Sequence, residues 1–281
     1  MSTYPYRLVN VFTRAGVVWS GNPLCVFERA QGLDAQTMQA LALQFNLSET
    51  TFILPAQQGC SARVRIFTTT FEMPFAGHPT LGTAHVCRAL GLGGDQLSLE
   101  MPAGVISVRA SGDRWTLAAR APTWREVAEP PFVLASMLGI DKEDIADRPL
   151  WVDTGSEQLM IPLRDESAVR RARIRADLLQ QLRSRGGHAM AYVFAAAEGG
   201  LLVRFFFAHG LSVSEDPATG SAAANLGGWF LATGAALPCE VEISQGEYTG
   251  RPSSLRLQVD AQRQIHVSGE VIEIGRGTVH L

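Results

Sequence analysis

Two stretches of this 281-residue chain resemble each other, and this repeat constrains the fold more than any other feature. In each stretch, a strand that carries an arginine before phenylalanine is followed by a loop and then by Pro-x-x-Gly-(Thr/Ser)-Ala, which opens a helix of small residues. The first copy joins Arg63–Phe67 to Pro79–Ala84, and the second joins Val203–Phe207 to Pro217–Ala222. Self-similarity of this kind predicts a duplicated supersecondary unit.

The repeat predicts where the chemistry of the chain lies. Its alignment places His78 opposite Asp216, each just before a helix, with Gly77 and Gly220 allowing close approach to the backbone. If the halves pack about a pseudo-twofold axis, both helix starts converge on one cleft. Free N–H groups and the helix dipole then provide a binding site for an anion.

Composition places the chain among ordinary globular proteins of two domains. Apolar residues make up 46% and charged residues 18%, which allows a large core, and the net charge of −3 gives no attraction to nucleic acid or to anionic membranes. A basic run at Arg170–Arg175 comes with an apolar stripe at helical spacing, which is typical of a solvated helix face. We therefore expect a small-molecule ligand and neither a nucleic-acid nor a membrane partner.

One segment, Pro217–Cys239, has no charged residue and is long enough to span a bilayer. It contains several glycines and Asn225, and acidic residues flank it where basic residues would mark a membrane span. A helix that is apolar on all sides is also found where protein surrounds it. We interpret the segment as a buried core helix.

The sequence gives no sign of a cofactor, a metal or a disulfide framework. Its four cysteines form no CxxC pair, and the N-terminus lacks the pattern of a secretory signal, so we expect reduced thiols in the cytoplasm. Lys142, in a polar run, is the only lysine, which leaves no candidate for a buried Schiff-base or P-loop lysine. No GxGxxG motif follows a predicted strand.

Local patterns predict the individual elements. Asp34 is suited to cap a helix that Asn46 ends in a left-handed conformation. The segment Ala121–Pro131, with three prolines, is interpreted as the linker between domains. The remaining pattern predicts strands at 6–12, 49–54, 63–68, 105–110, 114–119, 191–195, 201–207, 241–244, 255–259 and 265–267.

Several motifs together resemble the PhzF-like family of phenazine biosynthesis proteins. In chain order they are GNP (21–23), NLSETTF (46–52), PFAGHPTLGTA (74–84), EDPATGSA (215–222) and QGEYTGRPS (245–253). The resemblance implies the α+β fold of diaminopimelate epimerase, which is a duplicated two-domain fold with a curved, mostly antiparallel sheet or barrel around a central helix in each half. We expect an N-terminal half at 1–124, completed by a strand at 268–281, and a C-terminal half at 125–267.

The resemblance also implies the site. In the family's best-understood member, the glutamate of NLSET moves a proton along a dihydro-hydroxyanthranilate, and Glu49 holds that position. Burial would raise the pKa of this carboxyl and strengthen it as a base. The family also uses the residues at His78 and Asp216 at the substrate, so these three are the predicted catalytic residues.

Five further residues are predicted to bind the substrate: Ser221, Asn22, Gly77, Thr219 and Gly220. Ser221 is expected to donate a hydrogen bond to the ligand carboxylate. A small residue that only allows close packing of the helix would give the same sequence pattern. The related epimerases use one cysteine per half as acid and base. Alignment on the helix starts gives Ala76 and Pro217 at those positions, which disfavours a two-thiol racemase.

The sequence therefore predicts a cofactor-independent isomerase that moves a proton between carbons of a small, unsaturated carboxylic acid. The family resemblance also implies a homodimer. Two alternatives stay open: a non-catalytic protein of the same fold that binds a small anion, and an epimerase that uses carboxylates in place of thiols. The sequence does not name the substrate or assign the chain to phenazine biosynthesis.

Overall fold

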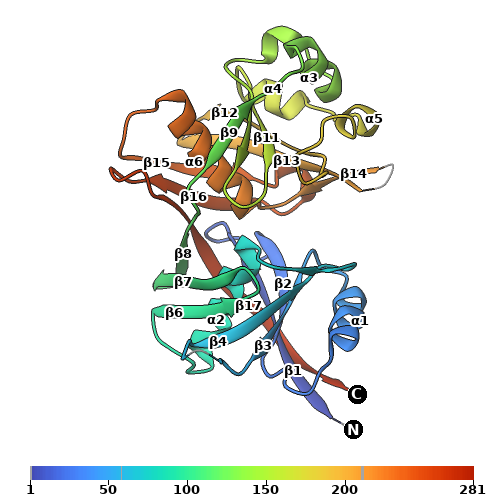
Figure 1. Ribbon diagram of the computed structural model, residues 1–281, viewed down its shortest axis with the longest axis vertical. Coiled ribbons are helices and arrows are strands. Elements are labelled where there is room, and N and C mark those ends of the chain that lie inside the picture. The colour runs from blue at the N-terminus through green and yellow to red at the C-terminus, as the bar shows by residue number, and fades with distance from the viewer. Residues whose placement is uncertain (1, 58, 210–211) are drawn as a thin grey trace. The chain divides into compact units, whose positions relative to one another are not determined.

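The computed structural model describes residues 2–57, 59–209 and 212–281, and its helices and strands are shown in Figure 1. The chain divides into two compact units. The first unit is Met1–Ala118 with Ser268–Leu281, and the second unit is Ala119–Val267. Strand β17 (Ile265–His280) begins in the second unit and continues into the first.

The boundary between the units follows residue 118, whereas the sequence predicts it after residue 124. The predicted linker, Ala121–Pro131, contains strand β9 (Thr123–Glu126), which pairs antiparallel with β10 (Leu150–Asp153) of the second unit. The prolines of this segment lie before and after the strand. They are compatible with a short strand because none of them has to donate to its ladder.

The first unit is a closed barrel of eight strands. Around the barrel the order is β1, β2, β3, β4, β6, β7, β8 and β17, and the β2–β3 and β4–β6 pairs are parallel. The strands not yet given are β1 (Thr3–Val11), β2 (Asn22–Phe27), β3 (Thr50–Leu54), β4 (Ala62–Phe67), β6 (Gln96–Met101), β7 (Gly104–Ser111) and β8 (Arg114–Ala118). A short strand, β5 (Glu72–Met73), forms a hairpin with β4.

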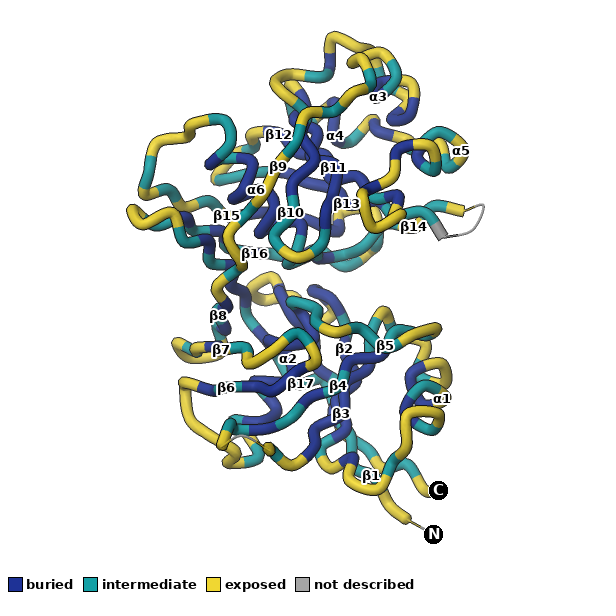
Figure 2. The backbone as a smooth tube through the Cα atoms, in the orientation of Figure 1, coloured by how far each residue is buried: buried dark blue, intermediate teal, exposed yellow. Residues whose placement is uncertain are grey.

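Helix α2 (Gly77–Ala89) lies against the inner faces of these strands. It contacts β1, β2, β3, β4, β6 and β8, and its residues from His78 to Ala84 are buried (Figure 2). Helix α1 (Ala35–Phe45) packs on β3 and β4. As predicted, the Asp34 side chain accepts from the Thr37 amide at its start, and Asn46 ends it with φ of 52°.

The second unit repeats this order of strands. Strands β9 to β13, β15 and β16 pair in sequence, and the β11–β12 and β13–β15 pairs are again the parallel ones. Helix α6 (Gly220–Thr233) contacts β9, β10, β11 and β16. The strands not yet given are β11 (Gln158–Pro162), β12 (Met190–Ala197), β13 (Gly200–His209), β14 (Ser212–Asp216), β15 (Cys239–Gln245) and β16 (Ser253–Val259). The predicted duplication is therefore confirmed in its strand order.

The residue alignment predicted for the repeat is wrong by five positions in the first half. The β4–β5 hairpin pairs Phe67 with Glu72, and the β13–β14 hairpin pairs Phe206 with Glu215. These registers, and the helix starts at 77 and 220, match residues 73–78 to residues 216–221.

His78 therefore corresponds to Ser221 and not to Asp216, whose counterpart is Met73. Pro217 corresponds to Pro74 rather than Pro79, which lies inside α2. The physical reason is a difference in hairpin length. Strands β13 and β14 stay paired from Phe205–Asp216 to His209–Ser212, whereas β4 and β5 pair only at Ile66–Met73 and Phe67–Glu72, and this offset is invisible in the motifs.

Two corresponding ion pairs, one half-buried and one buried, support the corrected alignment. Arg65 binds Glu72 at 2.6 Å and lies over the ring of Phe67. In the second unit, Arg204 binds Glu215 at 2.7 Å and lies over the ring of Phe206. In both hairpins the arginine therefore links the two strands by an ion pair just before the helix.

The charge-free segment is a core helix, as predicted. Most residues of α6 are buried within the second unit, including Asn225 and Trp229. None of the helices in the described residues is both long and apolar enough to cross a membrane.

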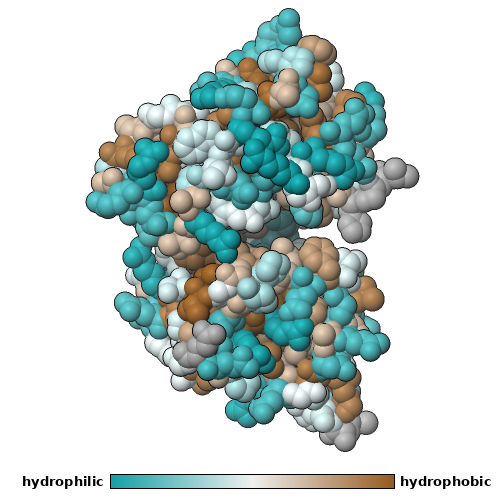
Figure 3. Space-filling view, in the orientation of Figure 1, coloured by the Kyte–Doolittle hydropathy of each residue, from teal (hydrophilic) through white to brown (hydrophobic). Residues whose placement is uncertain are grey.

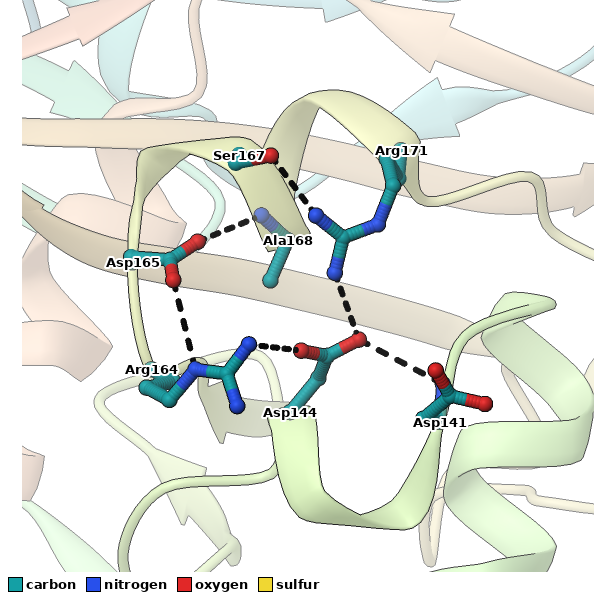
Figure 4. A network of polar contacts seen from close by, with 7 residues as sticks. All are labelled: Asp141, Asp144, Arg164, Asp165, Ser167, Ala168 and Arg171. Atoms are coloured by element: carbon teal, nitrogen blue, oxygen red, sulfur yellow. Dashed lines mark hydrogen bonds and ion pairs between the residues drawn. The ribbon is translucent and has the colours of Figure 1, made fainter.

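The basic run does not form one helix. It is divided between two short helices, α4 (Glu166–Arg171) and α5 (Ala176–Leu179), which follow α3 (Pro131–Leu138) and lie on the side of the second unit where Figure 3 shows many hydrophilic side chains. Figure 4 shows one contact of the run: the buried carboxylate of Asp144 accepts from Arg171 at 2.7 Å and, from before α4, from Arg164 at 2.9 Å. These arginines neutralise a buried charge, because Asp144 would otherwise be costly to bury.

A substitution at Gly82 of α2 tests how closely the strands of the first barrel pack on the helix. A Cβ there would lie 2.6 Å from Leu24 Cδ2 and 2.9 Å from Val11 Cγ2, both in the core. We expect Gly82→Ala to lower the free energy of unfolding by about 1–2 kcal/mol, although alanine is the better helix former. Gly94→Ala, where no atom lies within 4 Å, is the control for denaturant unfolding. A Gly82→Ala protein as stable as wild type would contradict a closely packed barrel.

Candidate active site

The first unit brings two predicted catalytic residues together. Glu49 directly precedes β3, and His78 is the second residue of α2, which lies inside the barrel. Glu49 Oε2 lies 3.4 Å from His78 Nε2, and the two side chains are only 16% and 8% exposed. A carboxyl group and an imidazole are thus held in contact at the edge of the core.

The imidazole of His78 is neutral. Burial lowers its pKa to about 3, and a hydrogen bond with the backbone of Pro23 opposes this shift only in part. Proline has no N–H, so the ring donates to the Pro23 carbonyl. Nε2 is buried without a hydrogen bond within the described residues, which leaves Nδ1 as the donor. Nε2 therefore carries a lone pair toward Glu49, and the contact is not an ion pair.

The GNP motif supports this arrangement from β2. Gly21 has φ of 78°, and a Cβ there would lie 2.5 Å from the Val11 carbonyl oxygen, so only glycine fits. Asn22, the first residue of β2, is buried and pairs with Val11. Pro23 follows and supplies the carbonyl that holds His78. The motif is thus explained by close packing and by one hydrogen bond to the imidazole.

The second unit assembles a different set of groups around Asp216, the last residue of β14. The Thr219 hydroxyl donates to Asp216 Oδ2. Gln245 Nε2 donates to the Asp216 carbonyl oxygen at 2.9 Å and to Thr219 Oγ1 at 3.0 Å, and its Oε1 accepts from the Thr219 amide at 3.2 Å. One buried glutamine therefore fixes the loop that presents the aspartate.

Gly246 explains why a glycine follows this glutamine. Its φ is 84°, and a Cβ would lie 2.2 Å from the Arg251 carbonyl oxygen and 2.7 Å from that of Pro217. The QGE motif therefore packs directly on the loop before α6. Sequence reasoning quoted the motif but gave Gln245 no role, because nothing local indicates which distant loop a glutamine reaches.

Ser221, the second residue of α6, takes part in a separate buried network. Gln158 Nε2 donates to Ser221 Oγ at 3.0 Å, and Gln158 Oε1 accepts from Asn225 Nδ2 at 2.9 Å. Sequence reasoning missed Gln158 and gave Asn225 no function. The available signal was Asn225 itself, a polar side chain in a helix predicted to be buried, which must find hydrogen-bond partners.

The starts of α2 and α6 are alike in one respect that matters for ligands. The residues before them, Ala76 and Thr219, make no side-chain cap hydrogen bond to the helix. The first helical residues, Gly77 and Gly220, therefore present N–H groups that the helix itself does not use. Each helix start can therefore donate hydrogen bonds to an oxygen atom of a ligand.

The predicted residues thus fall into two groups. Glu49, His78, Asn22 and Gly77 lie in the first unit, and Asp216, Thr219, Gly220 and Ser221 lie in the second. The structure brings Glu49 into contact with His78 and Thr219 into contact with Asp216, whereas Ser221 contacts Gln158 in a separate network. We name these groups the first and second half-sites.

Metal or thiol chemistry has no support in the described residues. No cluster of three histidine, cysteine or acidic side chains there could hold a metal ion. With the corrected alignment, the epimerase cysteine positions are Ala76 and Thr219, which replaces the earlier assignment of Pro217. Burial raises the pKa of the Cys87 thiol to about 12 and that of Cys25 further still, so neither is a ready nucleophile.

The neutral state of His78 predicts a specific pH dependence of stability. Its pKa is about 3 in the folded protein and about 6.5 in the unfolded chain, so the unfolded chain binds more protons between these values. Stability is therefore fully present above pH 6.5 and is lost as the pH falls toward 3, by up to about 1.4 kcal/mol per pH unit. His78→Asn keeps a donor for the Pro23 carbonyl but does not titrate.

We expect the loss of unfolding free energy between pH 7 and pH 5 to be smaller in His78→Asn than in wild type, measured by urea denaturation. His188→Asn, at an exposed position, is the control and should behave as wild type. Equal slopes for wild type and His78→Asn would show that the imidazole is not held neutral.

Comparisons with known proteins agree with this architecture. Residues 9–277 match the PhzC-PhzF family, described as phenazine biosynthesis-like protein. An uncharacterised isomerase of Pasteurella multocida is 39% identical over 99% of this chain and 94% of its own. The trans-2,3-dihydro-3-hydroxyanthranilate isomerase of Pseudomonas chlororaphis is 32% identical over 98% of this chain and 99% of its own.

The fold is also found in solved structures. The crystal structure of a PhzF-family phenazine biosynthesis protein from Bacillus anthracis has a TM-score of 0.87, with 22% identity and both chains covered in full. The predicted duplicated fold of the diaminopimelate epimerase type is thereby confirmed. From its sequence and its fold, the chain belongs to the PhzC-PhzF family of phenazine biosynthesis-like proteins.

Proposed function

We propose that this protein is a cofactor-independent isomerase that moves a proton between two carbons of a small, unsaturated carboxylic acid. The observation that carries the proposal is the contact between Glu49 and a neutral His78, at 3.4 Å. A carboxyl group in such a setting can take a proton from carbon and return it to another carbon, with no metal or organic group in the reaction.

The proposed step is balanced within the substrate. Glu49 removes a proton from one carbon as that C–H bond breaks, and the electron pair moves into the adjacent unsaturated system. The same carboxyl then delivers the proton to a second carbon, where a new C–H bond forms and the double bond has shifted. No electrons leave the substrate, so the reaction needs no oxidant.

His78 acts on Glu49 rather than as a donor to the substrate. Sequence reasoning expects the imidazole to donate to a substrate oxygen. In the neutral ring, however, the proton lies on the nitrogen that binds Pro23, and Nε2 can only accept. A protonated Glu49 can donate to Nε2. The imidazole therefore stabilises the state in which Glu49 holds the proton between removal and return.

The second half-site holds the acid. Ser221 and the first N–H groups of α6 are donors suited to a carboxylate, and Asp216, fixed by Thr219 and Gln245, is suited to a hydroxyl or amino group of the ligand.

The relatives support the class of reaction. Proteins that are 39% and 32% identical to this chain are named isomerases, and the substrate in one of these names, a dihydro-hydroxyanthranilate, is an unsaturated cyclic acid with a hydroxyl group. The identity of the acid used by this protein is left to experiment. We also propose that the protein acts as a cytoplasmic homodimer, as the family resemblance implies.

Two rival functions make different predictions. A binding protein of this fold would hold a small anion without moving a proton, and an epimerase would invert one carbon through two carboxylates. The rival epimerase needs a second base beside the reacting carbon. In the first unit the position of the related cysteine is Ala76, and in the second it is Thr219, whose hydroxyl is bound to Asp216.

A solvent-exchange screen tests the function. Small unsaturated and cyclic carboxylic acids, including trans-2,3-dihydro-3-hydroxyanthranilate, are incubated with the protein in D2O and followed by NMR. We expect the double bond to shift, with deuterium at a carbon different from the one that lost its proton wherever the Glu49 carboxyl exchanges with D2O before the return. Label at the original carbon with inverted configuration would support the epimerase, and binding with neither a shifted double bond nor label in any acid would support the binding protein.

The base is tested by Glu49→Gln, which keeps the volume and removes the carboxylate. We expect proton exchange to fall by roughly two to four orders of magnitude while the acid still binds, because a general base contributes about that much. Glu28→Gln is the matched control: its carboxylate is in the same unit and similarly buried, at 14% against 16%, but pairs with Arg7. Exchange by Glu49→Gln within tenfold of wild type would remove Glu49 from the mechanism.

A further inference from the structure

Ser221 lies at the end of a chain of buried amide side chains whose hydrogen-bond directions are fixed. The chain begins at the backbone after β10, passes through Asn225 of α6 and Gln158 of β11, and ends at the Ser221 hydroxyl. Asn225 and Gln158 are 0% and 1% exposed, so neither can touch a ligand directly. All these residues belong to the second unit.

The direction of the first side chain follows from the backbone. The Thr154 amide, which can only donate, lies 2.8 Å from Asn225 Oδ1. The Ser156 carbonyl, which can only accept, lies 2.8 Å from Asn225 Nδ2. Exchange of the oxygen and nitrogen of Asn225 would break both bonds, so the orientation of this amide is determined.

The orientation of the Asn225 amide in turn determines the orientation of the Gln158 amide and of the Ser221 hydroxyl. The second N–H of Asn225 Nδ2 donates to Gln158 Oε1 at 2.9 Å, which leaves Gln158 Nε2 to face Ser221 Oγ at 3.0 Å. Gln158 therefore donates, and the serine oxygen accepts with a lone pair. No hydrogen bond given by the Ser221 hydroxyl is found within the described residues, so its O–H remains to be donated.

We infer that Asn225 and Gln158 are positioning residues that commit the Ser221 hydroxyl to donate to the substrate, and that the substrate group at Ser221 is therefore an acceptor, a carboxylate oxygen. The inference rests on the proposed function, because it concerns the same acid. It adds a restriction to it: the ligand atom that receives the Ser221 O–H must be an acceptor. It also explains why a buried helix carries an asparagine.

Replacement of the Gln158 donor by an acceptor tests this inference. Gln158→Glu keeps the acceptor for Asn225 but places a second acceptor beside Ser221, so the hydroxyl turns to donate to the new carboxylate. We expect the affinity for anthranilate, measured by calorimetry, to fall roughly ten- to a hundredfold, the range for one hydrogen bond to a charged group. Thr154→Val is the matched control, because it removes the Thr154 Oγ1 hydrogen bond to Asn225 and leaves both backbone bonds in place.

A double-mutant cycle separates action through Ser221 from direct repulsion of the ligand. We expect Thr154→Val to bind anthranilate within threefold of wild type. In a Ser221→Ala background, we expect Gln158→Glu to weaken binding by less than threefold. Equal losses in Thr154→Val and Gln158→Glu, or the same loss with and without Ser221, would overturn the inference.

Neutron diffraction from ligand-free crystals of the deuterated wild-type protein provides a second measurement, which does not depend on the variants folding or on the ligand. We expect deuterium on Gln158 Nε2 pointing to Ser221 Oγ, and the serine deuterium directed elsewhere. A serine deuterium between the two atoms would refute the assigned direction. If wild type fails to bind anthranilate while the deuterium lies as expected, the proposed substrate class is wrong and the direction of the chain stands.

Discussion

The structure depends on one constraint in each unit: strands of a curved sheet surround a helix that has almost no face left for solvent. Helix α2 contacts six strands of its barrel, and its glycine at 82 allows β1 and β2 to approach closely. A helix enclosed in this way can expose polar groups only at its ends. The N–H groups at its start, together with the side chains just before and after it, then become the natural place for a ligand. The position of both half-sites follows from this enclosure.

The two halves have kept this architecture and differ in the residues at matching positions. His78, Met73 and Ala76 of the first unit correspond to Ser221, Asp216 and Thr219 of the second. One half therefore supports a carboxyl base with a neutral imidazole, and the other presents a fixed aspartate and a serine hydroxyl. Inversion of one carbon requires two matching bases, and the residues at matching positions of the two units are unlike.

Much of the fold was predictable because local chemistry determines it. Asp34 and Asn46 bound α1 as their side chains suggest, and the charge-free segment is a core helix because it has no polar face. The motif alone misaligns the repeat, because only Pro79–Ala84 matches it in full, whereas the hairpin registers match Pro217 to Pro74, which begins Pro-x-x-Gly without the rest of the motif. The local pattern of β9 predicts a linker, because its partner β10 lies outside that pattern.

The side chains at the site were predictable only in part, for a related reason. Glu49, His78 and Asp216 lie in motifs that a family resemblance identifies. The groups that control them do not: the Pro23 carbonyl, Gln245 and Gln158 reach the site from strands distant in sequence, and nothing in their local pattern indicates burial or direction. The protonation state of His78 likewise depends on burial inside a barrel, which no single stretch of sequence encodes.

The central claim is that Glu49, in contact with a neutral His78, exchanges the proton of a small acid. A crystal structure of the Glu49→Gln protein with its acid bound measures this most directly, because the variant should hold the substrate without converting it. We predict that the reacting carbon of the ligand lies against the side chain at position 49 and beside His78. A ligand whose reacting carbon lies away from position 49 would contradict this claim.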